Sequence, residues 1–272
     1  MNRHHHSRDG LRLSALMAAI LTGVATLPAQ AETGSANAGD IAVHINVLGV
    51  AQLDVNPQAP SGFNGATDAT YQQNSLPSVD QGNAFLSLTA ANIASEAQYQ
   101  PGVSLSAAGS DVTIENLNLS AVNLLGASLL SIGANLISSE SQVIGYCLPA
   151  GRQTRQSLDD ISFFNGFDNG NLTPGGPGPT PPTVTLGGVD ISILGIPVSN
   201  IPLNPEPNTS VDLSALGIAG ATLILNEQAI TGDGVNMSSL ASNALHLTLN
   251  DAGVITADVV LGHSDSTLDC TQ

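Results

Sequence analysis

The chain has 272 residues, of which 42% are hydrophobic and 10% are charged, and its formal net charge at pH 7 is −17. It contains no lysine, and a nucleic acid or an anionic lipid surface requires clustered basic side chains, so the composition argues against both as partners. No tryptophan and an aromatic content of 3% leave little material for stacking sugars or peptides. The length provides enough apolar residues for one large or two smaller all-β domains without metal or many crosslinks.

Residues 1–31 have the features of a secretory signal peptide. Arginines precede a short apolar segment, and Ala29-Gln30-Ala31 has the small-x-small pattern of a cleavage site, so we expect cleavage between Ala31 and Glu32. No later apolar run has the length of a membrane-spanning helix. No cysteine follows the apolar segment for lipid attachment, and no C-terminal anchor is recognisable. The sequence therefore predicts an exported protein that is secreted, periplasmic or associated with the cell surface.

Residues 32–148 form the first predicted β unit. Apolar and polar residues alternate in 41–50 (IAVHINVLGV) and again in 112–122, with the period of two that is typical of strands with one buried face. The segment 124–137 is more continuously apolar, which fits either a buried strand or a short helix. We favour a strand because this segment has a counterpart near the C-terminus.

Residues 149–183 differ in composition and are predicted to be an exposed loop or linker, because they include the proline- and glycine-rich run TPGGPGPTPP. The loop also holds the densest group of acidic residues, Asp159, Asp160 and Asp168, and residues 231–236 form a second oxygen-rich stretch. Calcium takes six to eight oxygen ligands, and neither stretch has a known calcium-loop spacing. The three aspartates are the calcium candidates, ordinary turn-forming residues are the alternative, and we predict no metal or cofactor.

Residues 184–272 form the second predicted β unit, which includes a hairpin with strands at 245–249 and 254–260. Its start, ISILGI at 191–196, parallels INVLGV at 45–50. Its end, 255–270, aligns without gaps on 132–147, with Ser264 on Ser141 and Cys270 on Cys147. We predict an all-β fold of two similar antiparallel units, related by an internal repeat and packed as a sandwich or paired sheets, with little helix outside the signal peptide. Barrel and solenoid arrangements stay open.

Cys147 and Cys270 are the two cysteines of the chain. Two cysteines in an exported protein most often pair, and their matched places in the repeat would bring them together. We predict that they form a disulfide, with buried free thiols as the alternative. Two cysteines are too few for a tetrahedral thiolate metal site.

The histidines after the leader are His44, His246 and His263. The segment 262–266 (GHSDS) combines a histidine, serines and a carboxylate, which invites a hydrolase interpretation. However, no GxSxG, HExxH, Walker or GxGxxG motif is present, and nothing fixes a nucleophile beside a base. We therefore predict that the protein is not an enzyme.

An ordered series of motifs, NEQ at 226–228, NALHL at 243–247 and ADVV at 257–260, followed by Cys270, resembles the choice-of-anchor P family of exported bacterial proteins. The resemblance covers nearly the whole chain after the leader. It implies a secreted or surface β protein of unknown molecular activity whose relatives end in differing C-terminal anchors, and it carries no catalytic motif.

From these features we predict a secreted or cell-surface, non-enzymatic structural or interaction protein with an unknown extracellular partner. Two other classes stay open. One is an extracellular binding module for a cation such as calcium, a glycan or a peptide, and the other is a hydrolase of unrecognised type. The sequence leaves the oligomeric state open.

Overall fold

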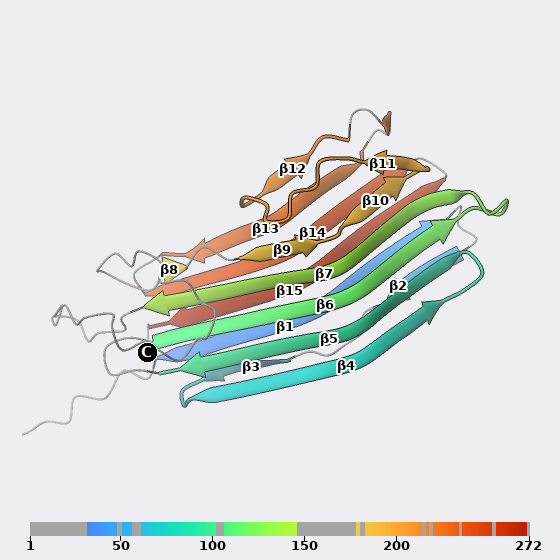
Figure 1. The fold of residues 1–272 in the computed structure, drawn as a ribbon. Helices are drawn as coiled ribbons and strands as arrows, with labels where there is room; N and C mark the ends of the chain where they lie inside the picture. The colour runs from blue at the N-terminus through green and yellow to red at the C-terminus, as the bar shows by residue number, and fades with distance from the viewer. Residues whose placement is uncertain are drawn as a thin grey trace, which may run out of the picture. The chain divides into compact units, whose positions relative to one another are not determined.

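The protein is described from a computed structural model, which covers residues 32–47, 51–55, 61–101, 106–145, 178–179, 183–213, 216–217, 220–233, 236–251 and 254–270. These residues belong to one compact unit, Glu32–Gln272, and Met1–Ala31 is a separate unit. Every helix or strand assigned among the described residues is a β-strand, and the strands form two packed antiparallel sheets (Figure 1). The predicted all-β fold is therefore confirmed, as paired sheets of a sandwich.

The first sheet, sheet A, has seven strands in the order β12-β13-β14-β15-β1-β2, and β3 also pairs with β1. Its strands are β1 (Thr33–Val47), β2 (Ala51–Val55), β3 (Ser61–Ala66), β12 (Thr209–Val211), β13 (Thr222–Gly232), β14 (Met237–Asp251) and β15 (Ile255–Asp269). The pairing of β14 with β15 confirms the hairpin that was predicted from alternation on either side of a polar turn.

The second sheet, sheet B, has eight strands in the order β11-β10-β7-β6-β5-β4, and the short strands β8 and β9 also pair with β7. Its strands are β4 (Thr70–Gly82), β5 (Leu86–Gln100), β6 (Ser106–Val122), β7 (Ser128–Gly145), β8 (Gly178–Pro179), β9 (Val184–Gly187), β10 (Asp190–Ile193) and β11 (Ile196–Val198). The apolar segment 124–137 begins with a turn, and from Ser128 onward it is part of the strand β7. The prediction of a strand rather than a helix is therefore confirmed. β8 belongs to the predicted linker, most of which lies outside the described residues.

Each predicted unit contributes strands to both sheets. From the first unit, β1, β2 and β3 lie in sheet A, and β4 to β7 lie in sheet B. The second unit does the reverse, because β9 to β11 pair within sheet B and β12 to β15 within sheet A. Among the described strands, the first, β1, thereby pairs with the last, β15, and β10 of the second unit pairs with β7 of the first. The two halves of the chain are intertwined through the sandwich.

In each sheet, two of the long strands contain a residue with left-handed backbone near their middle. Asn92 and Asn116 have a φ of 50° in sheet B, and Asn226 (φ 50°) and Gly262 (φ 66°) are the corresponding residues in sheet A. Asparagine and glycine tolerate this conformation better than other residues. Asn226 lies between the pairs Leu225–Leu245 and Glu227–Asn243 of β13 and β14, and the register is the same on both sides of it. The long strands bend near their middle in Figure 1. Beyond each such residue, the alternation of inward and outward side chains changes phase.

The core between the sheets has three consecutive zones. A large apolar cluster fills most of the sandwich and includes Ile114, Ile132, Leu247 and Val259. A second, smaller cluster surrounds Tyr99 near one end. Between the two clusters lie six serines with exposed fractions of 0 to 2%. This serine layer consists of Ser110, Ser139, Ser141, Ser242, Ser264 and Ser266.

The serine layer joins the sheets by hydrogen bonds between residues 125 positions apart in the chain. Ser139 Oγ lies 3.2 Å from Ser264 Oγ, and Ser141 Oγ lies 2.8 Å from Ser266 Oγ. The ungapped alignment of the two halves places Ser141 on Ser264, two positions away from the residue that it contacts. The motifs Ser-Glu-Ser of β7 and Ser-Asp-Ser of β15 are therefore the segments that face each other.

Candidate functional site

A continuous chain of polar contacts lies on the outer face of sheet A and crosses four adjacent strands. We call it the histidine–carboxylate network. Its members come from β1, β13, β14 and β15, and they point away from the core because their neighbours in each strand point inward. They are Asn37, Glu227, Asn243, His246, Asp258, His263 and Asp265.

His246 lies between two carboxylates. Its Nδ1 is 2.7 Å from Glu227 Oε2 on β13, and its Nε2 is 3.0 Å from Asp258 Oδ1 on β15. The side chains of His246 and Glu227 are 25% and 28% exposed, so this contact is partly shielded from water, whereas Asp258 is 62% exposed. A carboxylate accepts hydrogen bonds, so His246 makes both contacts at once only when both ring nitrogens carry a proton.

Asn243 connects the two histidines. Its Nδ2 donates to Glu227 Oε2 at 2.8 Å, and its Oδ1 is 2.7 Å from His263 Nδ1. On the other side of His263, the Nε2 atom is 3.6 Å from Asp265 Oδ2, and Asp265 Oδ1 accepts a hydrogen bond from Asn37 at 3.2 Å. Each contact joins side chains on neighbouring strands or on one strand, so the network holds the outer face of sheet A in one register.

Gly262 makes the centre of the network possible. At Gly262, with its φ of 66°, the inward and outward alternation of β15 changes phase while the register stays continuous: Leu261 lies opposite Leu245 and points inward, whereas His263 lies opposite Asn243 and points outward. A Cβ atom at position 262 would lie 2.9 Å from the Ala244 side chain and 3.3 Å from Ile137 of the facing sheet. Both the backbone conformation and the packing therefore require glycine here.

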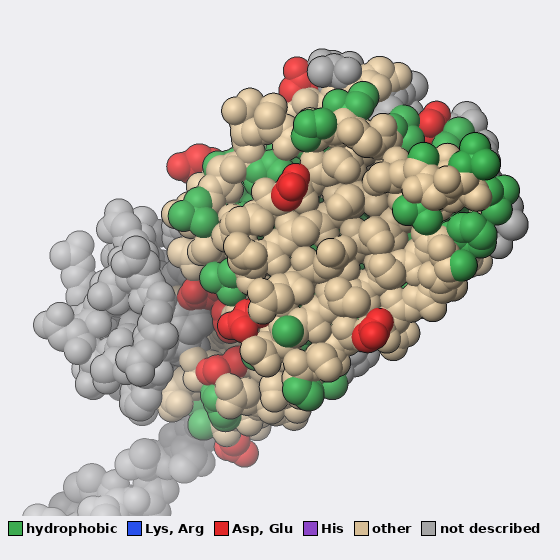
Figure 2. Space-filling view, turned by 45° about the vertical axis from the view of Figure 1, so that its right-hand side comes forward, with side chains coloured by type: hydrophobic (Ala, Val, Ile, Leu, Met, Phe, Trp, Pro, Cys, Tyr) green, Lys and Arg blue, Asp and Glu red, His purple; other side chains and the backbone are tan. Residues whose placement is uncertain are grey.

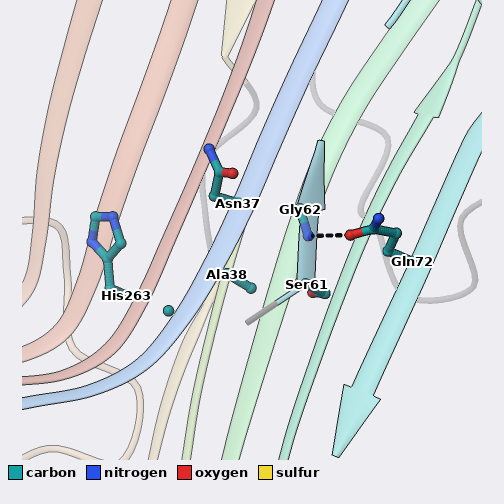
Figure 3. Close-up of a pocket in the computed structure, with 7 residues that line it drawn as sticks. Asn37, Ala38, Ser61, Gly62, Gln72 and His263 are labelled. Atoms are coloured by element: carbon teal, nitrogen blue, oxygen red, sulfur yellow. Dashed lines mark hydrogen bonds between the residues drawn. The ribbon is translucent and has the colours of Figure 1, made fainter. Parts of the chain in front are cut away.

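The network ends beside a shallow hollow of about 390 Å³, which Figure 3 shows between His263, Asn37 and the strands β3 and β4. Its polar lining includes Gln72, whose Oε1 accepts a hydrogen bond from the Gly62 backbone N–H at 2.8 Å. Ser61 also lines it, and the buried Ser61 hydroxyl has no hydrogen-bond partner among the described residues. The lining residues carry hydroxyl, amide and imidazole groups and no carboxylate.

The structure separates the histidine and the serines of the segment 262–266. His263 and Asp265 point outward into the network, whereas Ser264 and Ser266 are fully buried in the serine layer. Successive residues of a strand point to opposite faces, so a serine directly before or after His263 in β15 cannot contact its ring. This geometry argues against the hydrolase interpretation of the segment. Among the described residues, no group of His, Cys, Asp and Glu side chains has the arrangement of a metal site.

Several residues predicted from the sequence lie outside the described part of the chain. They are the cleavage-site residue Ala31, the calcium candidates Asp159, Asp160 and Asp168, and Cys147. Cleavage, calcium binding and the disulfide therefore stay predictions. The second oxygen-rich stretch is partly described, and there Asp233 Oδ1 accepts hydrogen bonds from the backbone N–H groups of Asn236 and Met237. Those bonds are ordinary turn interactions.

Glu32 and Cys270, the two residues of the predicted cleavage site and disulfide that the structure describes, lie near the small apolar cluster around Tyr99. Glu32, the expected first residue after cleavage, accepts hydrogen bonds from Tyr99 and Ser106. Burial, and next the negative charge of Glu32, raises the pKa of Tyr99 well above its ordinary value. Cys270 packs against the same cluster, its N–H donates to the Asn236 carbonyl at 2.6 Å, and it is not a free thiol.

The surface of the described residues is acidic and has no lysine or arginine, because all five basic residues of these types lie outside the described part. On the face shown in Figure 2, carboxylates are scattered among backbone and uncharged side chains, and hydrophobic side chains gather toward the right-hand end. Leu124 and Leu125, in the turn between β6 and β7, are 62% and 93% exposed. No helix long and apolar enough to cross a membrane occurs in the described ranges.

Comparison of the chain with protein-family models, curated proteins and solved structures gives no match. The resemblance to the choice-of-anchor P family therefore stays a prediction from the motifs. Those motifs lie in β13, β14 and β15, and each supplies part of the histidine–carboxylate network: Glu227 from NEQ, Asn243 and His246 from NALHL, and Asp258 from ADVV. Their polar positions could be read from the sequence, but the pairing of Glu227 with His246 depends on strand register.

Proposed function

We propose that this chain is a secreted or cell-surface protein with a structural or interaction role and no enzymatic activity. The observation that carries the proposal is the way in which the outer-face histidines are bound. The ring nitrogens of His246 and His263 contact carboxylates and an amide, and none of these described contacts is to a hydroxyl nucleophile. Such contacts stabilise strand pairing, whereas a general base needs a free ring nitrogen directed at the group that it deprotonates.

Two features support export. The leader 1–31 has the pattern of a signal peptide. The compact unit begins at Glu32, next to the predicted cleavage site, and the Glu32 side chain is hydrogen-bonded to Tyr99 and Ser106. Removal of the leader would therefore leave the new N-terminal residue fastened to the body of the protein.

The composition of the outer faces supports an interaction role with partners other than polyanions. The described residues offer hydroxyl, amide and carboxylate groups over two broad sheets, without a basic side chain other than histidine. Such a surface repels polyanions and makes hydrogen bonds to neutral or cationic partners. The acidity also keeps the protein dispersed outside the cell.

Export is tested by fractionating cells that express the full chain with an epitope tag inserted after Gly126, in the exposed turn between β6 and β7. We expect tagged protein that begins at Glu32 by mass spectrometry and that is labelled by antibody on intact cells or recovered from the periplasm or medium. An Ala31→Arg variant, which blocks a small-x-small cleavage site, should keep the leader. Tagged protein that stays in the cytoplasm with an intact N-terminus would contradict the proposal.

The absence of serine-hydrolase activity is tested with a fluorophosphonate probe, which reacts with activated serines. We expect no labelling of the purified exported protein, because Ser264 and Ser266 are buried and face away from His263. A Ser264→Ala variant is the matched comparison. Labelling of the unaltered protein that disappears in the variant would establish an activated serine and overturn the non-enzymatic proposal.

A further inference from the structure

In the described part of the chain, β4 is a long edge strand of sheet B. It runs over 13 residues, Thr70–Gly82, and pairs with β5 alone among the described strands. Gln73 and Ser75 are exposed, and no described strand other than β5 pairs with this part of β4. In an antiparallel pair, alternate residues direct their N–H and C=O groups away from the partner strand, and β4 therefore presents a row of backbone donors and acceptors to solvent.

The other outer strands are short, and residues 70–76 of β4 have no charged residue, proline or bulge to protect the edge. The strands β11 and β12 have three residues each. Natural edge strands are protected by charged side chains, especially lysine, by proline, by bulges or by a covering segment. Between Asp68 and Asp80 the chain has no charged residue, although its net charge is −17. One interruption is present, at Pro77, which lies between the pairs Leu76–Ile93 and Ser78–Ala91.

We propose that β4 pairs antiparallel with β4 of a second copy of this chain, which joins two eight-stranded sheets edge to edge. The uninterrupted part of the strand runs from Thr70 to Leu76, because Pro77 has no N–H to donate. Its central residue is Gln73. A twofold axis at Gln73 places Gln73 opposite its own copy and Tyr71 opposite Ser75.

Charge and side-chain chemistry favour a second copy as the occupant. In this register, Asp68 lies opposite Ser78 and not opposite another carboxylate, so two acidic chains meet along their uncharged segment. Glutamine amides both donate and accept, and identical strands can therefore join them in pairs. The Gln72 amide oxygen already binds the Gly62 N–H of β3, which fixes this part of β4 to the body of the protein before any partner arrives (Figure 3).

The association should be weak at low salt and should tighten as salt is added. Seven paired residues form a small interface of the kind found in transient complexes. Two chains with the same large net charge repel each other at long range, and salt screens that repulsion. This inference rests on the proposed interaction role and deepens it. Edge pairing would allow copies of the chain that are exported to a surface or matrix to bind each other directly.

The register is tested by introducing Gln73→Cys into the exported full chain and oxidising mildly. Directly opposed residues of an antiparallel pair have Cα atoms about 4.5 to 5.5 Å apart, which falls in the range that a disulfide spans. We expect a disulfide-linked dimer on a non-reducing gel. Ser131→Cys is the matched control, because Ser131 lies on the outer face of the interior strand β7 and should not crosslink.

The energetics are tested by sedimentation velocity over a wide range of protein concentration. Gln73→Asp places the new carboxylates of the two copies directly opposite each other and should raise the dimer dissociation constant by about tenfold, since like charges opposite each other on paired strands are destabilising. Ser131→Asp makes the same change of charge away from the edge and should leave the constant unchanged. A monomer at every concentration, or equal weakening by both variants, would overturn the edge pairing. Either result would leave the export proposal standing, since cell fractionation measures that separately.

Discussion

The Ser141 hydroxyl on β7 lies 2.8 Å from the Ser266 hydroxyl on β15, and Ser266 Oγ also donates to the Ser141 carbonyl oxygen at 3.0 Å. Both side chains are fully buried between the sheets. A buried polar group is costly without a partner, so the serine layer is stable only in the register that satisfies its hydroxyls. This contact therefore specifies how the two sheets are placed against each other.

Replacing Ser141 by alanine should destabilise the protein. The change removes the partner that Ser110 Oγ and Ser266 Oγ share, although each keeps a bond to a backbone carbonyl. We expect Ser141→Ala to lower the free energy of unfolding by about 1 to 2 kcal/mol. Urea unfolding measures this change, and Ser131→Ala, on the outer face of the same strand, is the control. Equal stability of the two variants would show that the serine layer contributes nothing.

Gly34→Ala should destabilise the protein by overpacking the small apolar cluster. The Tyr99 ring packs directly on Gly34, and a Cβ atom at that position would lie 2.1 Å from the nearest ring carbon. Relief requires movement of a ring that is 1% exposed. We expect a loss of about 1 to 3 kcal/mol in thermal or urea unfolding. In a Gly34→Ala, Tyr99→Leu double variant, the smaller side chain should relieve part of that loss. The packing explanation would be contradicted if the double variant lost more unfolding free energy than the two single variants lose together.

Asp111→Asn should stabilise the protein at neutral pH. Asp111 lies between Glu96 and Glu140 in the strand register of sheet B. Burial, and next the charge of Glu96, raises the pKa of Asp111 to about 6. The folded state therefore holds this proton more tightly than the unfolded state, so the stability that protonated Asp111 gives is present below about pH 4 and is lost as the pH rises to about 6.

The asparagine variant carries no charge and escapes this loss. We expect it to be more stable than the unaltered protein by about 1 to 3 kcal/mol at pH 7.5 and similar to it near pH 4. Unfolding by urea at a series of pH values measures the difference. Asp80→Asn, at an exposed position of β4, controls for the removal of one charge from an acidic protein. A stability difference that does not change between pH 4 and pH 7 would refute the buried-carboxylate explanation.

Cys147 and Cys270 should form one disulfide in exported protein. Cys270 is fixed by its backbone hydrogen bond to Asn236 and is not a free thiol. A crosslink that closes a long loop is expected to stabilise by about 2 to 4 kcal/mol, so Cys270→Ser should lower the unfolding free energy by this amount. Non-reducing peptide mapping checks the pairing directly. Recovery of both thiols by alkylation under native, oxidising conditions would end the prediction.

Local patterns in the sequence were sufficient for the strands and for the class of fold. Alternation on both sides of a polar turn predicts the hairpin of β14 and β15, and the structure contains it. The alternation carries this information because every second side chain of a half-buried strand must be apolar. Alternation left both a strand and a helix open for residues 124–137, and the counterpart near the C-terminus favoured the strand that the structure contains as β7.

The tertiary structure decided which strands share a sheet and which polar residues meet. The pairing of β1 with β15 joins residues as far apart in the sequence as Thr33 and Asp269, and no local pattern encodes a contact at that separation. The left-handed residues Asn226 and Gly262 change the phase of alternation within a strand, so the parity of a residue number does not give its face along the whole strand. That change places Ser264 inside and His263 outside, and strand alternation keeps these two residues of the hydrolase candidate on opposite faces. Strand register, which the packing of both sheets sets jointly, determines these contacts.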